Sequence, residues 1–313
     1  MDLIQFLNET DGTDNAINFS MKYGILPDRA PKTCVKCGGV DSLRINKYSR
    51  NPQVPYIFVC SQKSCRWSVS ISRNTIFDKL HFPLSHGLRL IYFWLLKLSV
   101  QDSSDQLQLP EHIVNEYYNH FRHVCAFIII NYTQPIGGPK HIIEMCEFHL
   151  QTREESYDVW MITGIDRSNG ENFVTHLSVM DSENLWPIIK NYILPGSVIV
   201  TDRHKEFTRK EKEAENPSLT FFPPSKKLRT EDDYHLDAMW NNLLDYVEKE
   251  IPPNTTDLRK ELYAYQFFYF NREEYCQKPA SQLILPFLID VKQVYPGFEK
   301  DPYLELRKSW KKH

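Results

Sequence analysis

Apolar and polar positions follow two different periods along this chain, and the change of period divides it into a helical part and a sheet-forming part. Apolar residues recur at helical spacing in 83–100 and again in 114–130, and a short polar segment separates these two runs. A helix, a short helix, a tight connection and a longer basic and aromatic helix are typical of a helix-turn-helix unit. The pattern therefore predicts a helical segment in the first half of the chain.

Shorter apolar runs follow one another after residue 140 and predict the strands of a sheet. The predicted strands are residues 141–150, 157–166, 172–180 and 197–202, with a helix at 182–193 before the last one. A charged, proline-rich loop is expected at 208–232, followed by helices at 234–249 and 258–275. This order of elements predicts an α/β fold with a mixed sheet.

These patterns divide the chain, which at 313 residues is long enough for two or three domains, into four segments. The predicted segments are an N-terminal helical segment at 1–30, a cysteine-containing segment with short strands at 31–73, the helical segment at 74–133 and the α/β domain at 139–313. Two glycines and two prolines in residues 134–140 make this stretch the clearest linker.

Charge is distributed unevenly between the two ends of the chain. Residues 26–100 contain twelve Lys and Arg against three Asp and Glu, a balance of +9, whereas 24 basic and 33 acidic residues give 101–313 a balance of −9. A basic module on an acidic body suggests that the first part binds a polyanion, although an uneven solvated surface would give the same numbers. The chain shows neither a signal peptide pattern nor an apolar run of the ~20 residues that span a membrane, so we expect an intracellular protein in a reducing compartment that does not bind membranes.

Cysteine spacing gives the strongest chemical signal in the sequence. A CxxC pair and a CxxxxC pair are separated by 22 residues that include two strand-like runs. Two tight turns that each deliver two thiolates form the tetrahedral sulfur site that Zn²⁺ prefers, and this arrangement is typical of a zinc ribbon. The predicted ligands of one structural Zn²⁺ per chain are Cys34, Cys37, Cys60 and Cys65. Cys125 and Cys276 lie in apolar helical contexts, and we interpret them as core residues.

Basic residues around the predicted ribbon are candidates for contacts with the phosphates of duplex DNA. The candidates are Lys36, Lys47, Arg50, Lys63, Arg66, Arg73 and, on the predicted recognition helix, Arg122. The competing interpretation is that the helices of this segment only brace the domain that follows.

Several motifs occur in an order that suggests a family. NTIF (74–77) follows the predicted ribbon, and ITGIDRSNG (162–170), LPGSVIVTD (194–202) and LDAMWNNLLDYV (236–247) come later. Over most of its length the chain resembles the transposases of Merlin elements and their bacterial insertion-sequence relatives. That family has a zinc ribbon, a helix-turn-helix segment and an RNase H-like DDE nuclease domain. The resemblance therefore implies an RNase H-like, DDE integrase-type sheet for residues 139–313.

The resemblance also implies where a nuclease site would lie. In this family three acidic residues hold two divalent metal ions that drive phosphodiester cleavage and strand transfer. The matching positions here are Cys146, Asp202 and Asp237, with Trp240 as the marker that follows the third one. Asp237 stands in place of the usual Glu, and Cys146 stands in place of the first Asp. Because Mg²⁺ prefers oxygen ligands, this triad is degenerate and no residue is assigned a catalytic role.

Glu144 is a candidate for a ligand that could replace Cys146. Glu144 lies two residues earlier on the same predicted strand, so it would share a face with Cys146 at roughly 7 Å along the strand. This distance makes it a poor replacement for the missing carboxylate.

The leading hypothesis is a transposase-derived, zinc-containing DNA-binding protein of the nucleus that has lost nuclease and strand-transfer activity. The alternatives are an active or weakly active DDE recombinase that uses Mg²⁺, and a protein-interaction module of a nuclear regulatory complex. Duplex DNA, a second copy of the chain and nuclear proteins are the expected partners.

Overall fold

The computed structural model describes residues 1–48, 51–150, 159–214, 217–224, 260–272 and 277–297, together with 239, 241–243, 245, 246 and 249. The chain divides into two compact units, which are described separately below. The first unit combines Met1–Val124 with the described residues of 277–297, and the second unit is Cys125–Arg272. The boundary falls inside helix α5 (Glu111–Tyr132), not in the glycine- and proline-rich stretch at 134–140.

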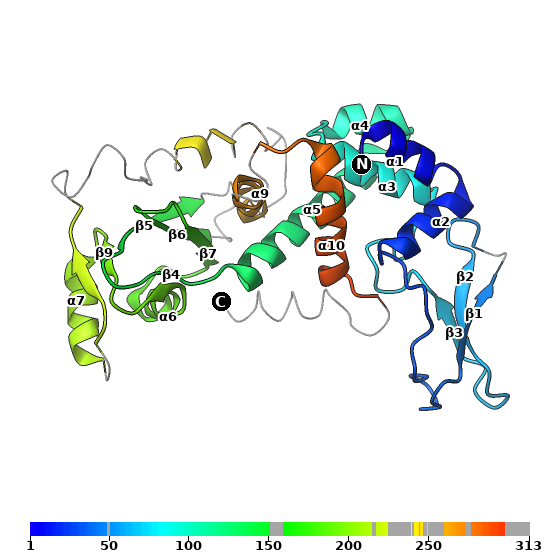
Figure 1. The fold of residues 1–313 in the computed structure, drawn as a ribbon, viewed down its shortest axis with the longest axis horizontal. Helices are drawn as coiled ribbons and strands as arrows, with labels where there is room; N and C mark the ends of the chain where they lie inside the picture. The colour runs from blue at the N-terminus through cyan, green and yellow to red at the C-terminus, as the bar shows by residue number, and fades with distance from the viewer. Residues whose placement is uncertain are drawn as a thin grey trace. The chain divides into compact units, whose positions relative to one another are not determined.

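The first unit consists of helices and a small antiparallel sheet (Figure 1). Its helices are α1 (Leu3–Thr10), α2 (Thr13–Lys22), α3 (Leu84–Leu95), α4 (Val100–Leu107), the first part of α5, and α10 (Ala280–Val294). Its strands are β1 (Leu43–Lys47), β2 (Tyr56–Cys60) and β3 (Ser68–Ser70), paired in the order β1-β2-β3. The sheet and the loops around it occupy the segment that was predicted to form a zinc ribbon.

Helices α3, α4 and α5 follow the order expected of the helical segment. The Ser99 side chain caps α4 by accepting a hydrogen bond from the backbone N–H of Asp102, and Gln108 ends the helix in a left-handed conformation. Only Leu109 and Pro110 then separate α4 from α5. A short helix, a tight connection and a long helix are therefore present, although α3 ends at Leu95, earlier than predicted.

The C-terminal helix α10 belongs to the first unit, whereas the sequence predicted one domain from 139 to 313. The ring of Phe287 on α10 lies 5.0 Å from that of Trp94 on α3 and 5.9 Å from that of Phe121 on α5. The N-terminal amine of Met1 donates a hydrogen bond to the carbonyl of Ser281 at 2.8 Å. Aromatic packing over a long sequence separation therefore places α10 with the N-terminal helices.

The second unit contains a five-stranded mixed sheet with the order β10-β9-β5-β6-β7. The strands are β5 (Ile142–Leu150), β6 (Val159–Asp166), β7 (Asn172–Leu177), β9 (Val198–Val200) and β10 (Thr220–Phe222). Strands β5, β6 and β7 form an antiparallel meander, and β9 and β10 add to the β5 edge as parallel strands. The helices are α6 (Ser182–Tyr192), α7 (His204–Glu213), α9 (Glu261–Asn271) and the second part of α5. A two-residue pairing joins β4 (Ile136–Gly137) to β8 (Ile193–Leu194).

The two faces of this sheet have different environments, because successive side chains of a strand point to opposite sides. On β5, Ile143 and Met145 belong to the apolar core that also includes Leu185 of α6 and Phe207 of α7. Glu144 and Cys146 alternate with them and therefore point to the opposite face. Strand β5 thus directs Glu144 and Cys146 away from the core formed with α6 and α7.

Residues 208–232 do not form the single long loop that the sequence suggested. Helix α7 and strand β10 lie within the stretch 204–222. The apolar pattern missed α7 because only Phe207 and Glu211 of this helix are buried, and β10 has only three residues. Most of the predicted helix at 234–249 lies outside the described residues.

In the described part of the chain, no helix has the length and apolarity required to cross a bilayer.

Candidate metal centre and the degenerate acidic site

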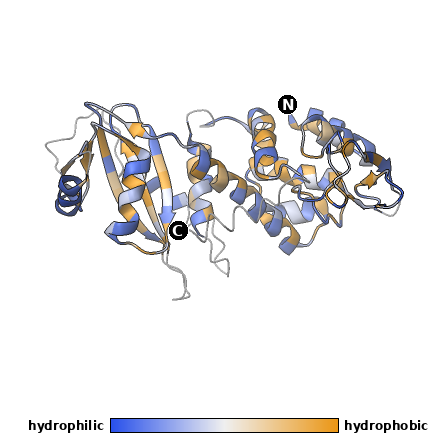
Figure 2. Ribbon diagram, turned by 90° about the horizontal axis from the view of Figure 1, so that it is seen from below, coloured by the Kyte–Doolittle hydropathy of each residue, from blue (hydrophilic) through white to orange (hydrophobic). Residues whose placement is uncertain are grey.

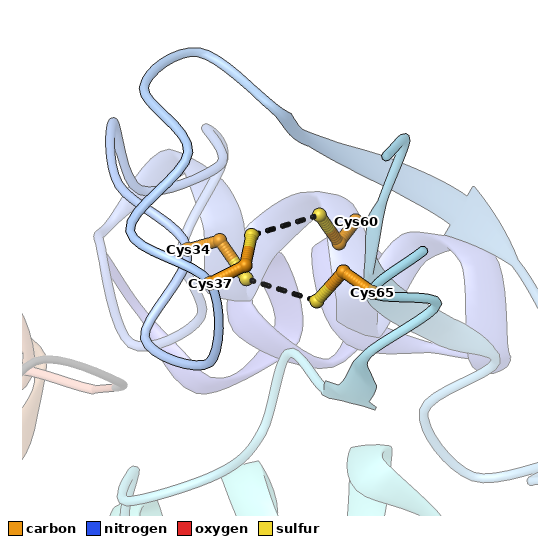
Figure 3. A group of neighbouring side chains, drawn as sticks. All are labelled: Cys34, Cys37, Cys60 and Cys65. Carbon is orange, nitrogen blue, oxygen red and sulfur yellow. Dashed lines mark hydrogen bonds between the residues drawn. The ribbon is translucent and has the colours of Figure 1, made fainter. Parts of the chain in front are cut away.

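The four predicted zinc ligands converge in space from separate parts of the small sheet (Figure 3). Cys34 and Cys37 lie in the loop before β1, Cys60 ends β2, and Cys65 lies in the turn before β3. Their sulfur atoms all lie within 4.8 Å of one another. Among the described residues, these cysteines are the only group of three or more His, Cys, Asp and Glu side chains close enough to share a metal ion.

The distances between the sulfur atoms fit a tetrahedral zinc site. The Sγ atoms of Cys34 and Cys65 are 3.8 Å apart, and so are those of Cys37 and Cys60. A tetrahedron with Zn–S bonds of ~2.3 Å has edges of about 3.8 Å, whereas a disulfide would bring two sulfurs to about 2.05 Å. The four thiols are therefore free and spaced for Zn²⁺.

Tight turns bring each cysteine pair together. The N–H of Gly38 donates to the Cys34 carbonyl at 2.8 Å, and Gly38 has a φ of +70°, which side chains other than glycine rarely tolerate. In the second turn the N–H of Cys65 donates to the carbonyl of Gln62 at 3.0 Å, and Arg66 follows with a φ of 47°. The longer spacing of the second pair is therefore taken up by one compact turn.

The acidities of the first two thiols differ because four clustered thiols cannot all ionise without a cation. Burial raises the pKa of the Cys34 thiol, but the backbone N–H groups of Cys37 and Lys36 outweigh it, and the pKa falls to about 7. The Gly39 N–H lowers the pKa of Cys37, but desolvation and the neighbouring thiols raise it to about 12. A bound Zn²⁺ reverses this competition, since a coordinating thiol is deprotonated by the metal charge.

Exposed cations lie on the segment that carries this cluster. The exposed members of the predicted DNA-contact set are Lys36, Lys47, Lys63, Arg66 and Arg73, and Arg50 lies outside the described residues. The Lys36 amine reaches the carbonyl of Cys65 at 3.4 Å, so it lies across the two turns. These side chains give the metal-binding segment a basic surface.

Arg122 does not fit its predicted role as a phosphate contact. It is only 5% exposed, and its guanidinium donates to the Oδ1 of Asn119 at 2.8 Å within α5. His123 beside it is 8% exposed. The sequence places both residues on a helix, but helical spacing alone does not show that Arg122 and His123 are buried. Cys125 is buried as predicted, and Cys276 lies outside the described residues.

Two of the three positions that the resemblance matches to a nuclease triad lie in the described part of the second unit. Strand β9 runs parallel to β5, and the pairing ends at Glu144 and Val200. Cys146 lies further along β5, and Asp202 lies in the turn that follows β9. Cys146 is half-buried and is not part of a disulfide, whereas Asp202 is exposed. Asp237 and its marker Trp240 lie outside the described residues, so the third position is not located.

Glu144 is not available as a substitute metal ligand, because it forms a buried ion pair. Its carboxylate lies 3.3 Å from the guanidinium of Arg167, and the two side chains are 7% and 3% exposed. Arg167 follows directly on β6, and its N–H donates to the carbonyl of Ile142 at the start of β5. The pairing of adjacent strands therefore fixes the charge pair, and spacing along the sequence alone could not reveal it.

A second arginine lies among the acidic residues near Asp202. The Arg203 guanidinium is 3.6 Å from the Glu147 carboxylate and 3.7 Å from that of Glu206. Burial raises the pKa of Glu147, Arg203 lowers it, and the nearby charges of Asp202 and Glu206 raise it further, so the net shift is upward. The Arg203 guanidinium thus lies between the carboxylates of Glu147 and Glu206.

A Ser, His and Asp group at the other end of β5 does not form a nucleophilic triad. The Nδ1 of His141 contacts both Asp166 Oδ2 at 2.6 Å and Ser168 Oγ at 3.1 Å. Ser168 also donates to Asp166 Oδ1 at 2.6 Å. A triad needs the serine and the aspartate on different ring nitrogens. This arrangement therefore fixes the turn after β6.

Comparisons with known proteins add little to this description. No family model matches the chain, and no curated protein matches it. Among solved structures, one similar chain comes from the cryo-electron microscopy structure of the simian T-cell lymphotropic virus intasome in complex with PP2A regulatory subunit B56 gamma. The similarity covers 63% of this chain and 72% of that chain, with 14% sequence identity and a TM-score of 0.31. A TM-score this low carries no argument about this chain.

Proposed function

We propose that this protein is a transposase-derived, Merlin-like DNA-binding protein of the nucleus, held together in its ribbon by Zn²⁺ and without nuclease or strand-transfer activity. The observation that supports it most is the four-sulfur cluster, whose spacing of 3.8 Å between paired sulfurs suits Zn²⁺. Exposed lysines and arginines lie on the segment that carries that cluster, and cations of this kind bind phosphates. The ribbon and the helices α4 and α5 are the proposed DNA-binding segment.

The second unit is proposed to keep an RNase H-like sheet as a scaffold or a surface for partners. Its meander with two parallel strands added at the β5 edge suits this fold, with the opening strand β5 next to the later strand β9. At the nuclease positions, Cys146 offers sulfur where Mg²⁺ prefers oxygen, and Arg167 and Arg203 neutralise the neighbouring carboxylates. These three features together favour loss of catalysis over a working recombinase.

Salt-dependent binding to labelled duplex DNA tests the DNA-binding part. For the full chain, we expect log K to fall linearly with log of the salt concentration, with a slope of about −0.9 per phosphate contact. The triple variant Lys47→Gln, Lys63→Gln, Arg66→Gln should reduce that slope by about 2 to 3 while zinc content stays unchanged. If the wild type did not bind the duplex even at low salt, the DNA-binding proposal would be wrong. The alternative of a protein-interaction module would then replace it.

A nicking assay with Mg²⁺ or Mn²⁺ tests the loss of catalysis. We expect the wild type to give no more cleavage than Asp202→Ala. Metal-dependent cleavage by the wild type that Asp202→Ala abolishes would establish the active recombinase instead. Cys146→Asp, with Cys146→Asp/Asp202→Ala as its control, asks whether restoring one carboxylate restores metal-dependent cleavage.

A further inference from the structure

Helix α7 of the second unit carries three exposed cations on one face. Lys205, Arg209 and Lys212, together called the α7 stripe, are exposed. Their spacing of four and three residues places them on one side of the helix, about 6 and about 4.5 Å apart along its axis. Figure 2 shows most of α7 in blue, the colour of hydrophilic residues. The sequence predicted a loop from residue 208 onward, so it gave no helical face for these cations.

The stripe points away from the core of its unit. Phe207 and Glu211 are the buried residues of α7, and Phe207 belongs to the core that includes Ile199 of β9. Helical geometry places the three cations on the outer side, since the inner side carries Phe207 and Glu211. The stripe is therefore presented to solvent within the second unit.

Glu206, Lys210 and Glu211 of this helix take part in ion pairs, whereas the exposed Glu213 takes part in none among the described residues. Lys210 lies 2.6 Å from Glu183, and Glu211 lies 2.6 Å from Lys190. Glu206 pairs with Arg203 at 3.7 Å. The residues of the α7 stripe take part in no such pair among the described residues, so their charges remain available to a partner.

We propose that the α7 stripe is a second contact for the phosphate backbone of duplex DNA, in addition to the ribbon. This inference rests on the proposed DNA binding. Charge complementarity identifies the partner, because three unpaired cations in a row suit a regular polyanion. An acidic protein surface is a poorer fit. Protein interfaces centre on large apolar or aromatic anchors, and none of the exposed large hydrophobic side chains in the described residues lies on α7.

The test uses the full chain and a labelled DNA duplex, with affinity measured between about 50 and about 200 mM salt. We expect the triple variant Lys205→Gln, Arg209→Gln, Lys212→Gln to reduce the salt slope by about 2 to 3. The matched control is Lys140→Gln, Lys278→Gln, Lys292→Gln, which removes three exposed cations elsewhere and gives the same net charge. The control should keep the wild-type slope.

The outcomes separate this inference from the proposed function. An unchanged slope in the α7 variant, with weakened binding in the ribbon variant, would overturn the α7 contact and leave the ribbon proposal intact. Equal losses in the α7 variant and the control would show a general charge effect and would also overturn it. A loss in the α7 variant alone, with the ribbon variant unaffected, would support the α7 contact and remove the ribbon from the DNA-binding surface. No binding by the wild type would overturn both.

Discussion

The cysteine cluster of the first unit and the acidic residues of strand β5 in the second unit both place ionisable side chains in buried or partly buried positions, but their charges are compensated differently. In the cluster, four thiols converge to within 4.8 Å of one another, which is the geometry of a shared metal ion. On strand β5, Glu144 and Glu147 each lie beside an arginine. The four thiols therefore face a common centre, whereas the two carboxylates each pair with a different arginine of the protein.

The largest difference between the two regions should appear when a cysteine is replaced in each. Cys60→Ser removes a zinc ligand, and structural zinc sites contribute about 10–16 kcal/mol to folding of small zinc domains. We expect zinc content to fall from about one ion per chain to near zero, with the ribbon becoming sensitive to proteolysis. Cys146→Ser is the matched control and should keep its zinc. Zinc retained by Cys60→Ser, as measured by metal analysis, would remove the cluster from consideration as a metal centre.

Breaking the buried ion pair in the second unit should have the next largest effect. Arg167→Ala leaves the Glu144 carboxylate buried without this partner, and removal of one member of such a pair costs about 3–5 kcal/mol. Arg203→Ala breaks a pair in which the arginine is 32% exposed, so its cost should stay below about 1 kcal/mol. Unfolding in urea measures both variants. Equal losses would mean that burial does not distinguish the two arginines.

The sequence predicts the cysteine cluster but not the ion pairs of Arg167 and Arg203, because the cysteine pairs are local in the chain and the ion pairs depend on which strands are neighbours. Each cysteine pair is local, so spacing alone identifies two turns, and only their meeting has to be supplied by the fold. Arg167 meets Glu144 because β5 and β6 are antiparallel neighbours, 23 positions apart along the chain. The resemblance singles out Cys146 and Asp202 in the sequence. That arginines lie beside Glu144 and Glu147 is seen only once the pairing of the strands is known.

The same distinction explains which parts of the fold were predicted. The predicted strands of the meander and the order of α3, α4 and α5 were correct, since their apolar patterns are strong. Helix α7 was missed because it buries only two residues, and α10 was assigned to the wrong unit because its aromatic contact with Trp94 spans most of the chain. Arg122 was misjudged because the sequence shows a basic residue on a helix but not what covers it.

A smaller effect tests the backbone of the first zinc turn. Gly38 has a φ of +70° and open space where a Cβ would lie, so Gly38→Ala costs only the strain of a left-handed residue, about 1 kcal/mol. That cost should weaken zinc affinity about fivefold in competition with a chelator. Gly12→Ala is the matched control, because Gly12 has a φ of +77°, equally open space and no part in the cluster. Equal zinc affinity in both variants would show that this turn does not need glycine.

Two acids of the second unit should differ in the sign of their pH dependence, and Glu147 should give the smaller effect. Because burial raises the pKa of Glu147 more than Arg203 lowers it, the folded protein holds this proton more tightly than the unfolded chain does. Its contribution to stability is full below the unfolded pKa of about 4.3 and is lost as pH rises through the higher folded pKa. Glu147→Gln should therefore gain in unfolding free energy relative to the wild type between about pH 4 and about pH 7, by less than about 1 kcal/mol.

Glu211 supplies the opposite sign within the same unit. Burial raises the pKa of Glu211, but the hydrogen bonds from Lys190 and from the N–H groups of Ser218 and Leu219 lower it more. Its contribution is present above the unfolded pKa and is lost as pH falls through the lower folded pKa. Glu211→Gln should therefore destabilise the protein by about 2 kcal/mol at neutral pH and by less at about pH 4, because charged hydrogen bonds are lost. If the unfolding free energies of the two variants changed with pH in parallel, the prediction for Glu147 would be wrong. Arg203 would then stabilise the ionised form of Glu147 enough to offset its burial, and the folded protein would not hold the proton on this carboxyl.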